Sequence, residues 1–361
     1  MKAVIEGVRI AGIRAVVPRE RHSYVEEPGI FTPDEARKLH ATIGVYERRV
    51  LPRPWCASDM CRAAAEGLLD QLGWDPASVD VLIFVSQDGD YVLPVTAAVL
   101  QRHLGLSSGA ACFDVTLGCS GFVYGLWMAG RLLGGSVKRA LVLCGDNSTR
   151  YLHPQDKATL PLFGDAGSAT ALELDETATP IRVALGTDGA GAKHIFVKAG
   201  GKRDNLIPTD PPRSEAEMQR LYRDARLQLN GAEVFAFTLR AVPGLLRDAL
   251  ADGGLTVDDL DFVVPHQANK MMLEHIRKKI GCPVMQEPED RHAITRKLGA
   301  FKTSMLQDVE AGRAIELDSI VGAAQEIGRH FNLSTPNIDA LLGLTRLFAR
   351  TRGLYPESVA A

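Results

Sequence analysis

The chain has 361 residues, of which 46% are apolar and 24% are charged, as in ordinary globular proteins. Its 41 Lys and Arg residues and 44 Asp and Glu residues give a formal charge of −3, which argues against a nucleic-acid-binding protein. No apolar stretch reaches the roughly 20 residues of a membrane helix, and Lys2, Glu6 and Arg9 interrupt the segment where a signal peptide needs an apolar core. We therefore expect a cytoplasmic protein that binds neither nucleic acid nor membranes.

Short runs rich in Val, Ile, Leu and Phe alternate along the chain with longer stretches of helical spacing. The short runs predict strands at Val81–Val85, Cys112–Val115, Ala140–Leu143, Ala169–Leu174, Ile181–Leu185 and Phe262–Val264. The longer stretches predict helices at Ala57–Leu72, Pro94–Leu104, Phe122–Leu133 and Glu233–Leu250. Strands and helices that alternate in this way indicate an α/β fold.

The last part of the chain differs, because strand-like runs stop after about residue 285. Amphipathic patterns there predict helices at Thr303–Ala311, Leu317–Gly328 and Pro336–Ala349. We expect residues 286–361 to form an all-helical tail.

A weak internal repeat links two distant segments. Residues 67–87 (GLLDQLGWDPASVDVLIFVSQ) and 244–267 (GLLRDALADGGLTVDDLDFVVPHQ) both predict a helix, a turn, an acidic residue and an apolar strand, and they end at Gln87 and Gln267. Two duplicated α/β units packed together would bring these strand ends to one shared cleft, where α/β proteins tend to bind ligands.

The six cysteines, at positions 56, 61, 112, 119, 144 and 282, form no CxxC pair, and the chain has no HExxH motif. We therefore expect no metal site. The pattern of most of these cysteines is typical of small apolar residues in a reducing compartment. Cys119 departs from that pattern.

Cys119 lies in a turn of small residues, Gly118–Gly121, between the predicted strand Cys112–Val115 and the predicted helix Phe122–Leu133. That helix is apolar on nearly every side, which predicts a central, buried position. Unpaired N–H groups at its amino end would stabilise a thiolate, which is the nucleophilic form of cysteine. The spacing leaves a second interpretation open, a structural cysteine in a glycine-rich turn.

His266 is the best candidate partner for a cysteine nucleophile among the nine histidines. It follows the predicted strand Phe262–Val264 and precedes a predicted helix that begins near Ala268. A position at the carboxyl end of a strand suits a catalytic group, and the repeat would bring it toward the cleft of the first half. A structural histidine is the alternative.

Six segments of the chain follow one another in the order found in one known family. They are GVYERRV (44–50), DYVLPVTAAVLQRHLGL (90–106), FDVTLGCSGFVYGL (113–126), LFGDAGSATALE (162–173), TDGAGAKHIFVKAGG (187–201) and VVPHQANKMM (263–272). Together they resemble the β-ketoacyl-acyl-carrier-protein synthases of type III, in the thiolase superfamily. Over about residues 1–282, the resemblance implies thiolase-like duplicated α/β halves, at 1–175 and, incompletely, at 176–285.

The resemblance also assigns an activity, an acyltransferase of fatty acid biosynthesis that forms a homodimer and needs no cofactor. Cys119 would accept an acyl group from an acyl-CoA or acyl carrier protein thioester, and His266 would donate to the thioester carbonyl. The acyl group would then be condensed with an extender unit or transferred. Asn269, in the HQAN segment, is a weaker candidate for substrate binding.

The chain departs from this family in two places. The family has an Asn in a GNTS-type turn about thirty residues after the His, but the region around Gly299 reads RHAITRKLGAFKTSMLQ, and the final strands and their glycine-rich turn are missing too. An activity without these donors would be impaired. Lys38 and Thr42 stand about where the family often has a Trp and an Arg that hold CoA, which argues against CoA binding in the family's usual mode. A carrier-protein thioester stays open as the substrate, since it would dock on Arg and Lys side chains.

The tail resembles another enzyme. Residues 297–344 resemble the helical carboxyl-terminal part of ketopantoate reductase, which has a Ser in a KxSM segment and a later Glu that contact substrate. The matching residues here are Ser304 and Glu316, for which a structural role at a helix start is the alternative. The chain has no GxGxxG motif after an initial strand, so hydride transfer would need a separate nucleotide-binding chain. Two alternatives to an acyltransferase therefore stay open: a catalytically silent fusion that binds acyl ligands or partners, and an oxidoreductase partner.

Overall fold

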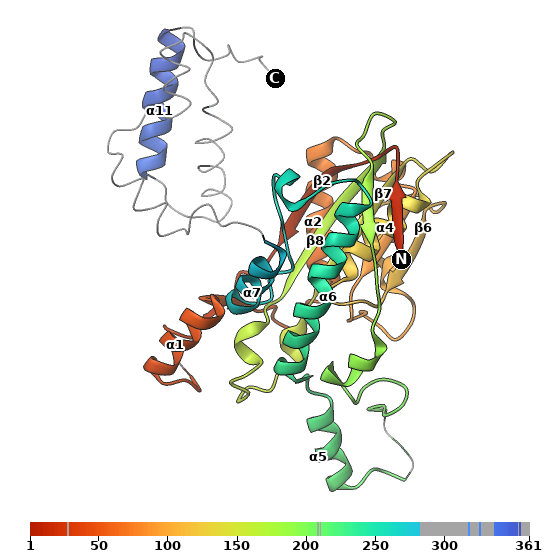
Figure 1. Cartoon of the computed structure of the whole chain (residues 1–361), viewed down its shortest axis with the longest axis vertical. Coiled ribbons are helices and arrows are strands. Elements are labelled where there is room, and N and C mark those ends of the chain that lie inside the picture. Colours follow the sequence, from red (N-terminus) through yellow and green to blue (C-terminus); the bar gives the residue numbers. More distant parts are fainter. Residues whose placement is uncertain are drawn as a thin grey trace. The chain divides into compact units, whose positions relative to one another are not determined.

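The computed structural model describes residues 1–26, 29–207, 209, 211–281, 317, 325, 336–352 and 354. The chain divides into two compact units, Met1–Pro283 and Val284–Ala361 (Figure 1). In the second unit, the described residues include one helix, α11 (Pro336–Thr351), which confirms the helix expected at Pro336–Ala349. The helix expected at Thr303–Ala311 lies outside the described residues, as does that at Leu317–Gly328 except for Leu317 and Gln325.

A five-stranded mixed sheet forms the centre of the first unit. Its strands, in spatial order, are β2 (Val8–Val16), β8 (Ala166–Leu174), β7 (Arg139–Asp146), β5 (Val81–Val85) and β6 (Ala111–Val115). Strand β5 runs parallel to both β6 and β7, whereas β8 runs antiparallel to β7 and β2. All five residues of β5 are buried, as expected for a continuous apolar run that is covered on both faces.

Three small sheets and several short elements accompany the main sheet. Strand β1 (Lys2–Ile5) pairs with β9 (Ile181–Ala184), β3 (Arg21–Ser23) with β4 (Glu47–Arg49), and β10 (Ile195–Phe196) with β11 (Gln228–Leu229). The other elements that precede residue 282 are α1 (Pro33–Ile43), the helices described below, and the 3₁₀ helices η1 (Pro76–Ser78), η2 (Ser148–Tyr151), η3 (Leu160–Leu162), η4 (Gly189–His194) and η5 (Val257–Asp259).

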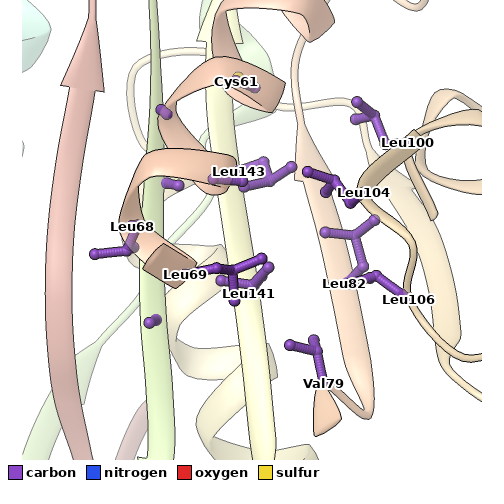
Figure 2. Packing of buried hydrophobic residues seen from close by; sticks show 14 of the residues in the cluster. Cys61, Leu68, Leu69, Val79, Leu82, Leu100, Leu104, Leu106, Leu141 and Leu143 are labelled. Atoms are coloured by element: carbon purple, nitrogen blue, oxygen red, sulfur yellow. The ribbon is translucent and has the colours of Figure 1, made fainter. Parts of the chain in front are cut away.

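Helices α2 (Ala57–Leu72) and α3 (Thr96–Leu104) cover one face of the sheet. Figure 2 shows the resulting core, in which Leu69 of α2 lies beside Leu141 of β7, while Leu68 points to the other side of the helix. Each fully buried leucine contributes roughly 1.5–3 kcal/mol through the hydrophobic effect. Helix α2 has the predicted bounds because its apolar residues recur at helical spacing and Gly73 ends it in a left-handed conformation (φ 62°).

Helix α4 (Gly121–Leu132) covers the opposite face, where Val81, Ile83 and Val85 point. It approaches closely because its inner side is made of small residues: a Cβ at Gly125 would lie 2.7 Å from Cγ1 of Val142. Its outer side is apolar and only partly covered: the Tyr124 hydroxyl donates to the carbonyl of Gly186 at 3.1 Å, whereas Val123 is 44% exposed. The prediction of a centrally buried helix is therefore wrong, because the described residues build no second sheet to pack over it.

The region after β9 is mainly helical, with α5 (Glu215–Asp224), α6 (Gly231–Ala251) and α7 (Lys270–Ile280). The strand predicted at Phe262–Val264 is wrong: these residues form no strand, and Phe262 and Val264 are 85% and 87% exposed. An apolar run becomes a strand only beside a partner strand, and no described residues provide one. The other strands and helices predicted before residue 282 are confirmed, with ends within three residues.

Candidate active site

Cys119 occupies a turn between strand β6 and helix α4. The N–H of Gly121 donates to the carbonyl of Gly118 across this turn, at 2.7 Å. Ser120 precedes the helix without a capping hydrogen bond from its side chain. Cys119 is exposed and has a free thiol, so the predicted strand–turn–helix setting is confirmed and a reagent can reach the sulfur.

The pKa of the Cys119 thiol is raised, which is opposite to the expectation from the helix terminus. Although the residue as a whole is exposed, desolvation around its sulfur is the largest cause, and the negative charge of Asp146 adds to it. The free thiol is therefore mostly protonated at neutral pH, and a reaction must remove its proton.

Acidic residues that sequence reasoning did not single out lie beside this turn. Asp146, at the end of β7, accepts hydrogen bonds from the Ser86 hydroxyl (3.0 Å) and the Gln87 N–H (2.8 Å). Asp88 accepts a hydrogen bond from the Tyr151 hydroxyl. Burial is the largest cause that raises the pKa of both carboxyl groups. Their position could have identified them from the sequence, because both stand at the carboxyl end of a buried strand.

A third buried carboxylate, Asp165, belongs to the GDAG turn and has a structural role. It is 2% exposed and accepts hydrogen bonds from the N–H of Leu51 (2.7 Å) and from the N–H and hydroxyl of Thr149 (3.1 and 2.7 Å). It therefore fixes the segment after β7, which carries Tyr151, against the segment after β4.

His266 lies in the extended segment that precedes α7 and is exposed. Burial of its imidazole lowers the pKa from 6.5, so the ring is neutral at pH 7 and has one N–H donor and one acceptor nitrogen. Among the described residues, no hydrogen bond or ion pair links His266 to Cys119. That the side chains of Cys119 and His266 face one shared cleft stays a prediction.

Among the cavities lined by described residues, two have neither Cys119 nor His266 in their walls. The larger, of about 780 Å³, is lined by residues of α5 and its surroundings, including Lys198, Arg223 and Arg226. The smaller, of about 600 Å³, lies along α6 and includes Arg240, Arg247 and Lys279.

The remaining predicted site residues have separate positions. The side-chain oxygen of Asn269 caps helix α7 by accepting from the N–H of Met272 at 2.8 Å. This bond commits its oxygen and leaves its NH₂ group for a ligand. Ser304 and Glu316 lie outside the described residues. Within the described part of the chain, no group of three or more His, Cys, Asp and Glu residues could hold a metal ion.

The other cysteines of the described region are free but less accessible than Cys119. Cys61 is buried, and Cys56, Cys112 and Cys144 are partly buried. Burial raises the pKa of Cys144 to about 12. Cys119 is thus the best placed of the five described thiols for a reaction with an external molecule.

The positions expected to hold CoA carry a different arrangement. Lys38 and Thr42 are exposed on α1, and the Thr42 hydroxyl donates to the carbonyl of Lys38 at 2.9 Å. The Lys157 ammonium forms an ion pair with Glu35 at 2.8 Å and lies 5.5 Å from the ring centre of Phe31. Nothing on this helix provides an aromatic face together with an unpaired arginine.

Comparison with known families places two matches along the chain. Residues 113–189 match the family of 3-oxoacyl-[acyl-carrier-protein (ACP)] synthase III. Residues 267–349 match the ketopantoate reductase PanE/ApbA C-terminal family, so this second match begins upstream of the tail expected from the sequence. No helix of the described residues is both long and apolar enough to cross a membrane.

Individual relatives extend the first match over most of the chain. A β-ketoacyl-[acyl-carrier-protein] synthase III of Symbiobacterium thermophilum is 33% identical over 326 residues, which cover 88% of this chain and 94% of the relative. One of Syntrophomonas wolfei is 33% identical over 66% of this chain and 70% of the relative. The crystal structure of a 3-oxoacyl-(acyl-carrier protein) synthase from Burkholderia xenovorans is 38% identical, covers 78% of this chain and 80% of that chain, and has a TM-score of 0.70.

Proposed function

Because the chain belongs to the β-ketoacyl-acyl-carrier-protein synthase III family, we propose that it is an acyltransferase that carries its acyl group on Cys119. Its homology supports an enzyme of the ketosynthase type. The observation that carries the proposal for Cys119 is its setting: an exposed thiol in a tight turn between a strand of the main sheet and an apolar helix.

The proposed first step is a thioester exchange. The Cys119 sulfur attacks the carbonyl carbon of the incoming thioester, a new C–S bond forms, and the bond to the carrier sulfur breaks. The proton of the Cys119 thiol leaves with the carrier thiol, so no other reactant is consumed. The raised pKa makes removal of this proton part of the energy barrier.

His266 is proposed as a hydrogen-bond donor to the thioester carbonyl. A neutral imidazole can donate its N–H without bringing a second charge to the site, and the lowered pKa of His266 favours this form at pH 7. This role requires the segment before α7 to bring the ring within hydrogen-bond distance of the acyl group.

The missing Asn turn limits what the enzyme can do after acylation. Loss of one oxyanion donor typically raises a barrier by about 3 kcal/mol, which slows the step by roughly two orders of magnitude. We therefore expect condensation to be impaired relative to acylation. Transfer of the acyl group to another acceptor, which needs no decarboxylation, would be affected less.

An acyl carrier protein is the proposed donor of the acyl group. Exposed cations cluster on two adjacent helices, with Arg240 and Arg247 on α6 and Lys270, Lys278 and Lys279 on α7. Three of them line the cavity of about 600 Å³, which has Leu239 and Pro243 at its apolar part. Asp188 pairs with Arg240, and Asp248 lies nearby on α6, so the surface keeps an excess of positive charge for an acidic partner.

A homodimer and a cytoplasmic location stay predictions. The loop before α3 is a candidate part of a homodimer interface. Its side chains Val92 and Leu93 are 88% and 79% exposed, and an interface would remove them from water.

Intact-mass measurement tests the proposal. The full-length protein is incubated with acyl carrier protein thioesters and with acyl-CoA, and an adduct of one acyl group is expected. Cys119→Ser should abolish it, whereas Cys56→Ser, which changes another partly accessible cysteine, should keep it. No adduct with any thioester would contradict the proposal.

A second candidate, acyl binding without turnover, is favoured by one observation: the segment that carries His266 forms no strand and has exposed apolar residues. In that case acyl-Cys119 forms but persists. Product release after addition of a malonyl carrier protein would exclude this candidate.

A further inference from the structure

Gln87 is held rigidly beside the nucleophile turn. It follows strand β5 by two positions, and its N–H donates to Asp146 at 2.8 Å. The preceding residue, Ser86, donates its hydroxyl to the same carboxylate oxygen at 3.0 Å. These two bonds to the half-buried Asp146 hold this segment against the end of β7.

The side-chain amide of Gln87 lies against Gly118, the residue before Cys119. A Cβ at Gly118 would come within 2.7 Å of Oε1 and 3.2 Å of Nε2 of Gln87. Glycine at position 118 therefore lets the amide approach the turn closely. The residue is exposed, and no described residue forms a hydrogen bond with its side-chain amide.

An acyl group on Cys119 would displace water from this amide. A purely hydrocarbon chain offers the amide no partner, and a buried unpaired amide weakens binding by about tenfold or more. An oxygen on the acyl chain can replace the lost water, because Gln87 has both donor and acceptor atoms.

The charges around the turn decide which kind of oxygen fits. Asp146 accepts a hydrogen bond from the N–H of Gln87, and its charge also acts on the sulfur of Cys119. A carboxylate on the acyl chain would meet this negative charge. A hydroxyl or keto oxygen carries no charge, so this negative charge would not repel it.

We propose that Gln87 selects acyl groups that carry an uncharged oxygen, hydroxyl or keto, close to the thioester carbonyl. This inference rests on the proposed function, since it names the substrate class of the Cys119 site. In this proposal Gln87 contacts the acyl group and determines selectivity, whereas Asp146 is a positioning residue that holds Gln87.

A competition experiment tests the proposal on the full-length protein. Equal amounts of butyryl, 3-hydroxybutyryl and succinyl thioesters of one carrier are offered together, and the three adducts on Cys119 are quantified by mass. The expected order is 3-hydroxybutyryl above butyryl by about tenfold, with succinyl lowest. Gln87→Leu should bring the ratio of 3-hydroxybutyryl to butyryl to one or below, whereas Gln155→Leu, an exposed glutamine on another loop, should leave it unchanged.

Each outcome separates the two proposals. Because the three thioesters compete within one sample, the ratio does not depend on the fraction of folded protein. A ratio near one in the unaltered protein, or an unchanged ratio in Gln87→Leu, overturns the inference about Gln87 and leaves acyl-Cys119 intact. Absence of every adduct overturns the proposed function itself.

Discussion

The two segments of the weak internal repeat, residues 67–87 and 244–267, have different surroundings: the first includes β5, beside the turn of Cys119, and the second includes His266. Cys119 lies between a paired strand and a helix that packs on the main sheet, next to side chains fixed by Asp146. His266 lies in an extended segment whose apolar side chains, Phe262 and Val264, are exposed. The same pattern of apolar residues therefore gives a buried strand in the first copy and none in the second. Pairing with neighbours decides which of the two forms.

The largest expected effect compares the same substitution in the main sheet and in the segment that carries His266. Val142→Ala removes two methyl groups from a fully buried side chain of β7 and should lower the free energy of unfolding by about 2 kcal/mol. Val264→Ala changes a side chain that is 87% exposed and should alter stability by less than about 0.5 kcal/mol. Urea unfolding measures both. Equal losses would show that the segment around Val264 is packed.

A smaller effect concerns the Cys119 thiol and the nearby carboxylate of Asp146. Asp146→Asn removes a negative charge that raises the pKa of Cys119, so the pKa should fall. More thiolate would then be present at a given pH, and the midpoint of the pH profile for alkylation of Cys119 should move to lower pH. Asp90→Asn, which changes a carboxylate bonded to Ser58, is the control and should leave the midpoint in place. An unchanged midpoint in Asp146→Asn would contradict this account of the thiol.

The smallest effect concerns the helix that follows His266. Asn269→Ala removes the cap of α7 and should destabilise the protein by about 1 kcal/mol, whereas Asn269→Asp, which keeps an acceptor oxygen, should restore most of this. Thermal unfolding in the absence of thioester measures the change. If Asn269→Asp keeps the stability but loses acylation, Asn269 binds substrate as well as capping the helix, whereas an equal loss of stability in both variants would contradict the capping role.

The α/β thiolase-like architecture and the helical character of the tail could be predicted from the sequence, and both are confirmed. The run VLIFV fixes β5 because it is apolar on both faces, and α2 is fixed by its spacing and its terminal glycine. The same kind of evidence failed at Phe262–Val264, since composition does not say whether a partner strand exists. It also failed for the burial of α4, which depends on elements elsewhere in the chain.

The electrostatics of the site could not be predicted in the same way. Cys119 was identified from local features, namely a turn of small residues before an apolar helix. Asp146 comes from a different strand, and only the parallel pairing of β5 with β7 brings it next to Gln87 and the turn. The expectation of a stabilised thiolate considered the helix terminus alone and therefore missed the burial and the carboxylate that raise the pKa.

Peptide mapping of the acylated protein tests the central claim most directly. After incubation with an acyl carrier protein thioester, the protein is digested and the acyl group is located by mass spectrometry. We predict that it lies on the peptide that contains Cys119, and that it is removed by hydroxylamine, as a thioester should be. An acyl group on another residue, or a protein that stays unmodified while its relatives react under the same conditions, would contradict the account.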